Sequence, residues 1–452
     1  METRKPAVLI LAAGMGTRMC SARPKVMHEI AGRSMIDHVL AAARALAPER
    51  IVVVIGPDMP ELAAAVAPVE TVVQGERLGT GHAVMAAREA LAGADGDVLV
   101  LFGDTPRLRP ETLAAMLAAR RHDSAPAVVV LGMRPEDPGE YGRLVTDSAG
   151  ELRAIVEYRD ANPDQRAIGL VNSGVVAVES ALLPDLLRDL TNDNAKGEYY
   201  LTDIVAAARR RGRGAGYVEA PADELVGINS RAELAAVEAQ VQVELRARAM
   251  AGGTTLIAPE TVFLSADTEL GRDVVVEPNV VFGLGVHVAN EARIRAFSHI
   301  EDARIAAGAV IGPFARLRPG AKIGERAHVG NFVEIKNATL GEGAKANHLS
   351  YLGDATIGAG ANIGAGTITC NYDGFAKWRT EIGTGAFIGT NTALVAPVKV
   401  GDGAVTGAGS VIATDVPADA LGLTRPSRKT VADWAARNRA RKKAAKPKPE
   451  TG

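Results

Sequence analysis

The chain has 452 residues, which is too long for one ordinary hydrophobic core, so we expect two domains. Lys and Arg number 51 and Asp and Glu 53, and the net charge of −2 gives no overall reason to expect a nucleic acid or a membrane surface as partner. The two cysteines, Cys20 and Cys370, lie far apart in sequence, which favours unpaired thiols in the cytoplasm over a disulfide framework.

Residues 1–229 alternate between short apolar runs and helix-like segments. We predict strands at residues 7–11, 51–55, 71–73, 98–102, 128–131 and 175–178, and helices rich in Ala and Leu at 35–46, 83–91 and 111–119. Strands that are covered on both faces are short and apolar throughout. The pattern therefore predicts a doubly wound, mostly parallel α/β sheet, whose first strand is too short to cross a membrane.

A glycine-containing loop follows the first strand. Gly14 and Gly16 precede Arg18, and a basic stretch ends at Lys25. Glycines let the backbone approach a phosphate, and the two cations can neutralise charge on a transferring phosphoryl group. The third glycine and the acidic partner of the dinucleotide-binding fingerprint are missing. The loop is predicted to bind phosphate, with a tight turn as the alternative.

Asp104 follows the predicted strand at 98–102. Ligands of open α/β sheets bind at the carboxyl ends of the strands, and a carboxylate placed there can hold Mg²⁺. A single Asp at such a position is also a common helix N-cap or loop residue, so the sequence leaves both interpretations open.

Residues 230–250 are predicted to form a linker helix. Leu234, Val237, Val241 and Leu245 recur at helical spacing, and the glycine pair at 252–253 ends the pattern. We place the boundary between the two domains here.

Beyond the linker the apolar period changes to six residues. The period is carried first by Ile305, Ile311, Leu317, Ile323, Val329 and Ile335, and later by Ile382, Ile388, Leu394 and Val400. A helix needs spacings of three and four, and an ordinary strand needs a spacing of two. Residues 251–430 are therefore predicted to form a β-helix of hexapeptide repeats, with one aliphatic side chain per repeat pointing inward.

Arg318 and Lys336 are candidate phosphate ligands in this repeat. They follow inward-facing residues that lie eighteen positions apart, and eighteen residues make one three-sided coil, so the two cations stack on the outside of adjacent coils. Glu334 on the same face is the alternative partner. His348 is the best candidate for proton transfer, although an isolated His in a repeat is more often a surface or turn residue.

The hexapeptide period is interrupted at residues 369–378. Insertions into a solenoid form loops that lie on one face and often carry function. This loop is predicted to form the wall of a site.

The end of the chain, residues 431–452, is rich in Lys, Arg, Ala and Pro and has no apolar period. Charge blocks of this kind are usually solvated, so we predict a basic, disordered tail.

Together these motifs resemble a known family. The resemblance is carried by residues 11–25, Gln74, 79–82, Asp104, 141–142, Glu157, Asn172, 197–200 and 227–229, and it extends over about residues 7 to 430. In them the chain is similar to the bacterial bifunctional N-acetylglucosamine-1-phosphate uridyltransferase / glucosamine-1-phosphate N-acetyltransferase. The resemblance implies a Rossmann-like nucleotidyltransferase domain, a left-handed parallel β-helix, and a role in supplying UDP-N-acetylglucosamine for peptidoglycan and lipopolysaccharide synthesis.

For the first domain, the resemblance implies uridylyl transfer from UTP to N-acetylglucosamine 1-phosphate with release of pyrophosphate. Arg18 and Lys25 would steady the phosphates, and Asp104 and Asn229 would hold Mg²⁺. The residues implied to contact the sugar nucleotide are Leu11, Ala12, Ala13, Gly14, Lys25, Gln74, Gly79, Thr80, Phe102, Gly103, Asp104, Gly142, Glu157, Asn172 and Asn229. Met27 stands where the family usually has Leu, and Phe102 where Tyr is common.

For the second domain, the resemblance implies acetyl transfer from acetyl-CoA to glucosamine 1-phosphate in a homotrimer, with His348 as general base. Arg318, Lys336, Tyr351 and Asn362 would contact the acetyl acceptor. The residues implied to contact acetyl-CoA are Ala365, Asn371, Tyr372, Thr390, Ala408 and Arg425. Thr390 stands where relatives often carry Ser.

Two other functions compete with this interpretation. In the first, a different sugar-1-phosphate nucleotidyltransferase uses its β-helix only for regulation or assembly, but the loop at 369–378 together with Arg318, Lys336 and His348 argues against it. In the second, the chain is a non-enzymatic assembly subunit, which the cations of the phosphate loop disfavour.

Overall fold

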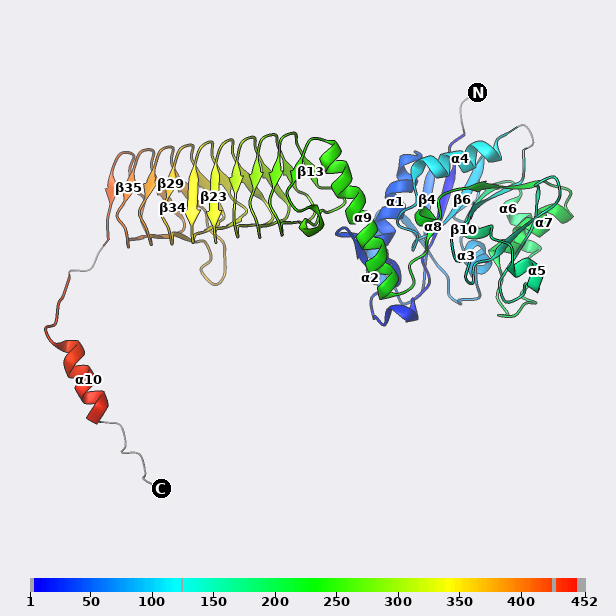
Figure 1. The fold of residues 1–452 in the computed structure, drawn as a ribbon, viewed down its shortest axis with the longest axis horizontal. Helices are drawn as coiled ribbons and strands as arrows, with labels where there is room; N and C mark the ends of the chain where they lie inside the picture. The colour runs from blue at the N-terminus through cyan, green and yellow to red at the C-terminus, as the bar shows by residue number, and fades with distance from the viewer. Residues whose placement is uncertain (1–3, 123–124, 425–427, 445–452) are drawn as a thin grey trace, which may run out of the picture. The chain divides into compact units, whose positions relative to one another are not determined.

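The computed structural model describes residues 4–122, 125–424 and 428–444. The chain divides into two compact units. The first is built from the residues up to Arg248 with Leu264–Ala266, and the second from Ala249–Phe263 and the residues from Asp267 onward (Figure 1). The division falls inside the last turn of the helix predicted at 230–250.

The first unit is built on a nine-stranded mixed sheet flanked by helices (Figure 1). The strands are β1 (Ala7–Leu11), β4 (Arg50–Ile55), β5 (Glu70–Val73), β6 (Asp97–Phe102), β7 (Val128–Met133), β8 (Arg143–Thr146), β9 (Leu152–Val156), β10 (Val171–Glu179) and β11 (Ala215–Glu219). Seven of them follow the order β11-β7-β10-β6-β1-β4-β5, and the hairpin of β8 and β9 joins β10. A separate small hairpin pairs β2 (Glu29–Ile30) with β3 (Arg33–Ser34).

The helices of this unit are α1 (Met35–Ala45), α2 (Pro60–Val66), α3 (Thr80–Ala86), α4 (Pro110–Arg120), α5 (Pro163–Arg166), α6 (Leu183–Arg188), α7 (Ile204–Arg210), α8 (Ala222–Leu225) and α9 (Arg231–Ala251). The helix predicted at 83–91 begins earlier, because Gly79, with a φ of 104°, ends the preceding loop directly before Thr80. It also ends earlier, since beyond Ala86 the backbone tightens into turns, with the Arg88 amide bonding to the Met85 carbonyl.

All six predicted strands are present, and the pairs β1 with β4, β1 with β6, β4 with β5 and β7 with β11 are parallel. Strand β10 differs from the expected parallel arrangement, because it runs antiparallel to both β6 and β7. An inner strand is apolar in either direction when both of its faces are covered, so its composition does not reveal its direction.

Side chains of the central strands alternate between two cores. In β1, Leu9 and Leu11 pack on one face of the sheet and Val8 and Ile10 on the other, and each contributes to a separate cluster of buried residues. This alternation explains the unbroken apolar run, because each successive side chain enters one core or the other.

Helix α9 packs its apolar stripe against the first unit. Val237 is buried, and Leu234, Val241 and Leu245 pack beside it on a cluster that includes Ile30. The apolar residues at helical spacing thus lie on the face of α9 that contacts the small β2–β3 hairpin.

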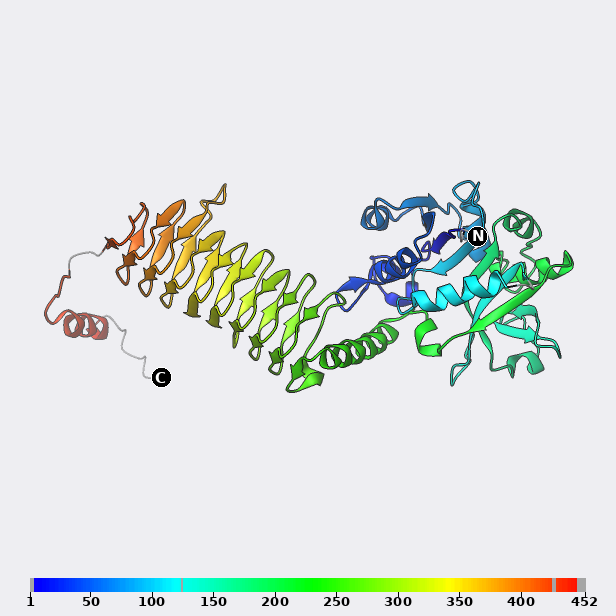
Figure 2. The same cartoon turned by 90° about the horizontal axis from the view of Figure 1, so that it is seen from above.

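The second unit is a left-handed parallel β-helix whose repeated coils are visible in Figure 2. Its three sheets contain ten, eight and eight strands. They begin at β12 (Thr255–Leu256), β13 (Glu269–Leu270) and β15 (Val281–Phe282) and end at β37 (Leu421–Gly422), β34 (Val398–Val400) and β36 (Val411–Ile412). The pairing of Leu317 with Ile335 confirms that one coil is eighteen residues long at this point.

The aliphatic residues of the six-residue period fill the interior of the β-helix. All ten positions named in the sequence analysis are buried, with at most 3% of each side chain exposed. Burying such an aliphatic side chain contributes about 1.5–3 kcal/mol, and the contribution repeats along the coil. The aliphatic residues of the hexapeptide pattern therefore form the core of this unit.

The tail differs from the sequence-based expectation. Helix α10 (Trp434–Ala444) occupies part of the segment predicted to be disordered, and residues 445–452 lie outside the described residues. Ala, Arg and Lys have high helix propensity, so a segment without an apolar stripe can still be helical. Within residues 4–122, 125–424 and 428–444, no helix has the length and apolar character of a membrane span.

Candidate functional site

The glycine loop begins where β1 ends. Gly16 has a φ of 68° and precedes the short 3-10 helix Thr17–Met19. A Cβ atom at Gly16 would lie 2.6 Å from Cβ of Lys25, whereas one at Gly14 would meet nothing within 4 Å. Gly16 thus allows the loop to pass close to Lys25, and Gly14 leaves the floor of the loop open to a ligand.

Lys25, Asp104 and Asn229 meet at the edge of the sheet. The Lys25 ammonium pairs with Oδ2 of Asp104 and donates to Oδ1 of Asn229 at 2.9 Å. The Lys25 and Asp104 side chains are 12% and 18% exposed, so the ion pair is partly shielded from water. The backbone amide of Asn229 donates to the Glu233 carboxylate, at the start of α9, at 2.6 Å, and this bond fixes the loop before that helix. Three segments that lie far apart in sequence therefore converge on one small polar cluster.

A cavity of about 280 Å³ opens beside this cluster. Ten of the predicted sugar-nucleotide residues line it: Leu11, Ala12, Ala13, Gly14, Lys25, Gln74, Gly79, Thr80, Phe102 and Asp104. Gln74 is buried and its side-chain amide donates to the Gly79 carbonyl at 3.1 Å. A Cβ on Gly79 would lie 2.7 Å from the Tyr199 carbonyl, so only glycine fits there.

A second cavity of about 220 Å³ shares Thr80 and Phe102 with the first. It is lined by Gly142, Glu157 and Asn172, the other three predicted sugar-nucleotide residues that face open space. Of the remaining two, Gly103 is buried and bonded through its amide to β1, and Asn229 contacts Lys25. Because they share two lining residues, the two cavities adjoin beside the carboxyl end of β6, and the pair is called the recess.

Burial shifts the acid–base behaviour of two residues that line the second cavity. It raises the pKa of the Glu157 carboxyl above its ordinary value, and the Thr202 hydroxyl, which donates to that carboxylate at 3.2 Å, opposes the shift. Burial also raises the pKa of the Tyr141 phenol. Both groups can exchange hydrogen bonds with the hydroxyls of a sugar.

The structure places two arginines, Arg18 and Arg77, differently from the sequence-based expectation. Arg18 is exposed on the 3-10 helix after the glycine loop and lines neither cavity. Arg77 was not singled out, although it lines the first cavity and its Nε donates to the Ala13 carbonyl at 2.9 Å. Arg77 stands between Gln74 and Gly79 in the sequence, and this position indicates that it lies near the same cavity.

In the β-helix, Arg318 and Lys336 lie on adjacent coils as predicted, since the Arg318 amide donates to the Ile335 carbonyl at 2.8 Å. Arg318 also donates to Glu334 at 2.8 Å, and this hydrogen bond raises the pKa of Arg318. The Arg318 Nε is buried and has no hydrogen-bond partner among the described residues. Glu334 therefore satisfies only part of the guanidinium, and an oxygen-rich ligand can satisfy the rest.

His348 ends strand β26 (Lys345–His348) and is exposed. Its Nδ1 lies 2.7 Å from Oδ1 of Asn331 on the neighbouring coil. This contact assigns the proton to Nδ1 and leaves Nε2 as the proton acceptor, because the amide oxygen can only accept a hydrogen bond. Tyr351 follows across the corner of the coil in β27 (Tyr351–Gly353), and Asn362 lies one coil further on, in register with Lys345.

Three of the predicted acetyl-CoA residues form a column along one corner of the β-helix. The Asn391 amide bonds to the Ala365 carbonyl, and the Gly409 amide to the Thr390 carbonyl, both at 2.7 Å. Thr390 and Ala408 are exposed. Arg425 lies outside the described residues.

The predicted insertion loop follows β30 (Ile368–Cys370) and precedes β31 (Thr380–Ile382). Asn371 is buried at its base and donates to Asp354, whereas Tyr372 is 62% exposed. Asp373 accepts hydrogen bonds from the amides of Phe375 and Ala376, and these bonds lower its pKa to about 2. The loop is thus a hydrogen-bonded structure with an exposed aromatic surface.

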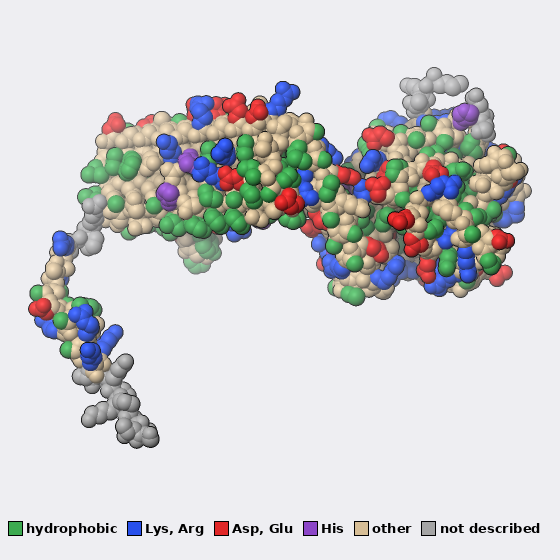
Figure 3. Space-filling view, in the orientation of Figure 1, with side chains coloured by type: hydrophobic (Ala, Val, Ile, Leu, Met, Phe, Trp, Pro, Cys, Tyr) green, Lys and Arg blue, Asp and Glu red, His purple; other side chains and the backbone are tan. Residues whose placement is uncertain are grey.

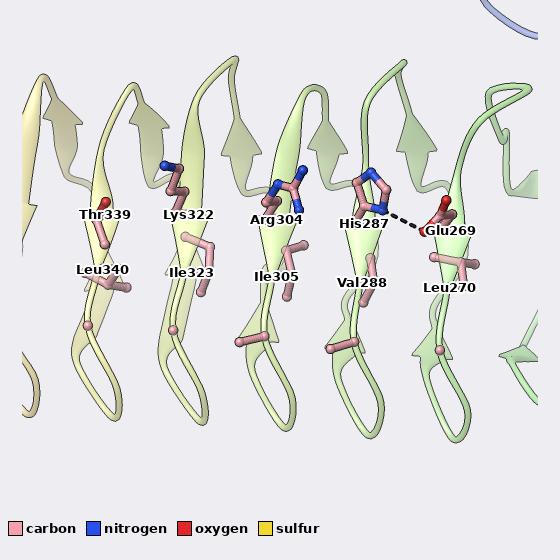
Figure 4. Close-up of a pocket in the computed structure, with 15 residues that line it drawn as sticks. Glu269, Leu270, His287, Val288, Arg304, Ile305, Lys322, Ile323, Thr339 and Leu340 are labelled. Atoms are coloured by element: carbon pink, nitrogen blue, oxygen red, sulfur yellow. Dashed lines mark hydrogen bonds and ion pairs between the residues drawn. The ribbon is translucent and has the colours of Figure 1, made fainter.

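Figure 3 shows cationic, acidic and histidine side chains gathered midway along the β-helix. A larger cavity, about 680 Å³, lies along one sheet of this unit (Figure 4). A row of Glu269, His287, Arg304, Lys322 and Thr339 borders it, and His287 bonds to Glu269 at 2.8 Å. None of the predicted acetyl-transfer residues in the described part of the chain lines this groove.

Known proteins resemble both parts of the chain. Residues 8–169 match the MobA-like NTP transferase domain, and residues 302–337 and 379–414 match the bacterial transferase hexapeptide of six repeats. The chain is 63% identical to the "Bifunctional protein GlmU" of Rhodospirillum rubrum, an alignment that covers 96% of this chain and 98% of the relative. It is 58% identical to the protein of the same name from Paramagnetospirillum magneticum, covering 99% and 100%.

Proposed function

We propose, from the premise that the chain belongs to the family of bifunctional GlmU proteins, that it makes UDP-N-acetylglucosamine in two steps at two separate sites. It is a bifunctional transferase that joins uridylyl transfer to acetyl transfer. The observation that best supports this function is the recess lined by the glycine loop, Lys25 and Asp104, in a chain that aligns with its relatives through both domains.

In the uridylyl transfer, an oxygen of the sugar 1-phosphate attacks the α-phosphorus of UTP. The bond between the α-phosphorus and the bridging oxygen breaks, and pyrophosphate leaves. Catalysis consists mainly of positioning and charge neutralisation. Gln74 and Gly79 would lie beside uracil, Glu157 and Asn172 would hold the sugar, and Lys25 would neutralise the phosphates, with Arg18 approaching from the exposed side.

Mg²⁺ fits the polar cluster at this site. Asp104 and Asn229 present the carboxylate and amide oxygens that Mg²⁺ prefers, and their contacts with Lys25 hold both oxygens close to one point. A bound Mg²⁺ would neutralise charge on the phosphates. Two protein oxygens are enough, because Mg²⁺ in such sites takes its other ligands from phosphates and water. Lys25 would turn from Asp104 toward the phosphates when the site is filled.

In the acetyl transfer, the amine of glucosamine 1-phosphate attacks the thioester carbon of acetyl-CoA. The carbon–sulfur bond breaks, the CoA thiolate leaves, and Nε2 of His348 accepts a proton from the amine. Arg318 and Lys336 would bind the phosphate of the acceptor. The unpartnered Arg318 Nε supports this role, because a phosphate oxygen supplies the missing acceptor.

We further propose that the protein is a homotrimer in the cytoplasm. The exposed His348, Thr390 and Tyr372 occupy the outside of a single β-helix, which suits sites that are completed by a neighbouring copy. The two free cysteines suit a reducing compartment.

A product assay of the purified protein tests the complete function. The reaction contains UTP, Mg²⁺, acetyl-CoA and glucosamine 1-phosphate, and each component is omitted in turn. UDP-N-acetylglucosamine is expected only in the complete mixture. Pyrophosphate release without any dependence on acetyl-CoA would favour a nucleotidyltransferase whose β-helix has no catalytic role, and no reaction of either kind would favour an assembly subunit.

A further inference from the structure

A third cavity in the first unit, about 220 Å³ in volume, is rich in arginine. It lies between α9, the β2–β3 hairpin and the loop before α4, and shares no residue with the nucleotide recess. Its lining residues are Ile30, Arg33, His38, Pro106, Arg107, Arg109, Val241, Glu244, Leu245, Arg248 and Ala266. Four arginines and one glutamate therefore line this cavity.

Arg107 is the fixed member of this group. Its side chain is only 8% exposed, and it pairs with Asp223 at 3.0 Å and with Glu244. It also donates to Gln240 at 2.6 Å. These contacts engage Asp223 and Glu244 and attach the loop before α4 to α9.

The other three arginines have no comparable partners. No ion pair or hydrogen bond joins the guanidinium groups of Arg33, Arg109 or Arg248 to any described residue. The Glu224 carboxylate lies beside Arg109 but accepts its backbone amide, at 2.8 Å. Burial lowers the pKa of the nearby His38 and favours its neutral form, while the Ile30 carbonyl, 2.9 Å from Nε2, opposes the shift. The cavity lining itself holds four arginines and one glutamate, and the carboxylates of Asp223 and Glu224 lie beside it. Like charges gathered around one cavity repel each other, and an anion in the cavity removes that repulsion.

We propose that this cavity binds a small molecule or ion that carries a phosphate dianion. Guanidinium groups bind phosphate through paired, charge-assisted hydrogen bonds, so arginine is suited to such a ligand. A water molecule occupies about 30 Å³ of liquid, so the cavity has room for roughly seven waters, which is enough for a phosphate group with a small substituent. The apolar side chains of Val241 and Leu245 line the cavity and suit a short carbon skeleton.

Calorimetric titration of the full-length protein with inorganic phosphate, and separately with pyrophosphate, tests this proposal. The titrations use a Lys25→Ala/Arg318→Ala background, because these residues lie in the two phosphate sites proposed above and their removal weakens anion binding there. Binding is expected to persist in this background and to weaken at least about tenfold when Arg109→Ala and Arg248→Ala are added. It should also weaken as the salt concentration rises.

A matched control carries Arg44→Ala and Arg210→Ala, two exposed arginines on α1 and α7 that lie outside the cavity. This control should bind both anions as the background does, and all variants should keep the same Tm. The proposal is wrong if the Lys25→Ala/Arg318→Ala background binds neither anion, or if the Arg109 and Arg248 substitutions leave its affinity unchanged. Uridylyl transfer is assayed separately in the protein without substitutions. If that activity is absent but anion binding follows the pattern above, the proposed function fails and the arginine cavity does not.

Discussion

At the scale of single residues, Lys25 has two partners, and the proposed uridylyl transfer requires it to exchange at least one of them for a phosphate. In the structure its ammonium balances the charge of Asp104 and bridges to Asn229. Phosphates and a metal ion change that balance, because the cation then has a more highly charged partner and the carboxylate has a divalent one. The three residues act as one unit, and substitutions among them should not be additive.

Asp104→Asn separates the two activities. The amide keeps the shape of the side chain but removes the charge that would hold Mg²⁺, so we expect uridylyl transfer to fall by at least about 10²-fold, comparable to loss of another single electrostatic group. Acetyl transfer should change less than about twofold. The two activities are assayed on one preparation, and equal loss of both in a folded protein would contradict independent sites.

His348→Ala tests the general base. General-base catalysis contributes about 10²- to 10⁴-fold, so the kcat of acetyl transfer should fall by such a factor while uridylyl transfer is unchanged. A structural role predicts the opposite pattern, with a lower Tm and a nearly unchanged kcat per folded protein. Acetyl transfer within a few-fold of the parent at saturating substrates would show that another group is the base.

Asn331→Ala tests how His348 is held. Asn331 does not touch the substrate in this proposal but fixes the imidazole through Nδ1. We expect kcat for acetyl transfer to fall less than in His348→Ala, with little change in KM for acetyl-CoA, because a freely rotating base is present but seldom oriented. Asn331→Asp, which also accepts the bond from Nδ1, should restore most of the rate. An Asn331→Ala enzyme with unchanged kcat would show that the contact is not needed.

At the scale of elements, Asp373 is the side chain with the most hydrogen bonds in the insertion loop. This carboxylate receives two backbone amides and the indole Nε1 of Trp378, and the Trp378 amide also closes the loop by donating to the Asn371 carbonyl at 2.8 Å. Because the loop is outside the repeating core, its order depends on these bonds and not on the buried aliphatic residues. Loop geometry and β-helix stability should therefore respond separately to substitution.

Asp373→Ala is expected to raise KM for acetyl-CoA, because the exposed Tyr372 beside it is no longer held, while the Tm changes little since the loop adds no core. Steady-state kinetics and calorimetry measure the two effects, and Glu381→Ala on the next strand serves as an exposed acidic control. An unchanged KM would exclude Asp373 as the residue that organises a coenzyme contact.

The pH dependence of the loop follows from the same carboxylate. Its pKa of about 2 in the folded protein lies below the ordinary value of 3.8. A depressed pKa gives a contribution that is fully present above the unfolded value and is lost as pH falls through the folded value. We therefore expect Trp378 fluorescence, measured in a Trp434→Phe background, to be constant between about pH 5 and 8. A transition inside that range would show that another group controls the loop.

At the scale of the whole molecule, the two activities are combined in one chain whose two units have separate cores. If the β-helix associates through its outer surface, oligomerisation belongs to the second unit and the uridylyl site needs no neighbour. A cyclic trimer would repeat one heterologous interface three times.

Light scattering of the purified protein should give a mass of about three times the 47.0 kDa chain at micromolar concentration. Dilution into the dissociated range should abolish acetyl transfer and leave uridylyl transfer intact, because the exposed acetyl-transfer residues need a partner copy. A monomer that retains acetyl transfer would contradict this.

The sequence by itself determined both architectures, because the period of the apolar residues is a local property. Six-residue spacing fits only the β-helix, and the alternation of short apolar strands with helices fits only an α/β sheet. The glycine loop and Asp104 were identifiable for the same reason, since each follows a strand end. The resemblance to a family supplied roles for residues such as Glu157 and Asn229 that no local pattern would single out.

Only the tertiary structure decided which distant side chains meet. The direction of β10 and the contact of Lys25 with Asn229 across 204 positions depend on chain crossings that no local period encodes. The arginine cavity is of the same kind, because Arg33, Arg109 and Arg248 come from three segments with ordinary surface compositions. Asp223 and Glu244 pair with Arg107, and which arginine a carboxylate reaches is settled only in three dimensions.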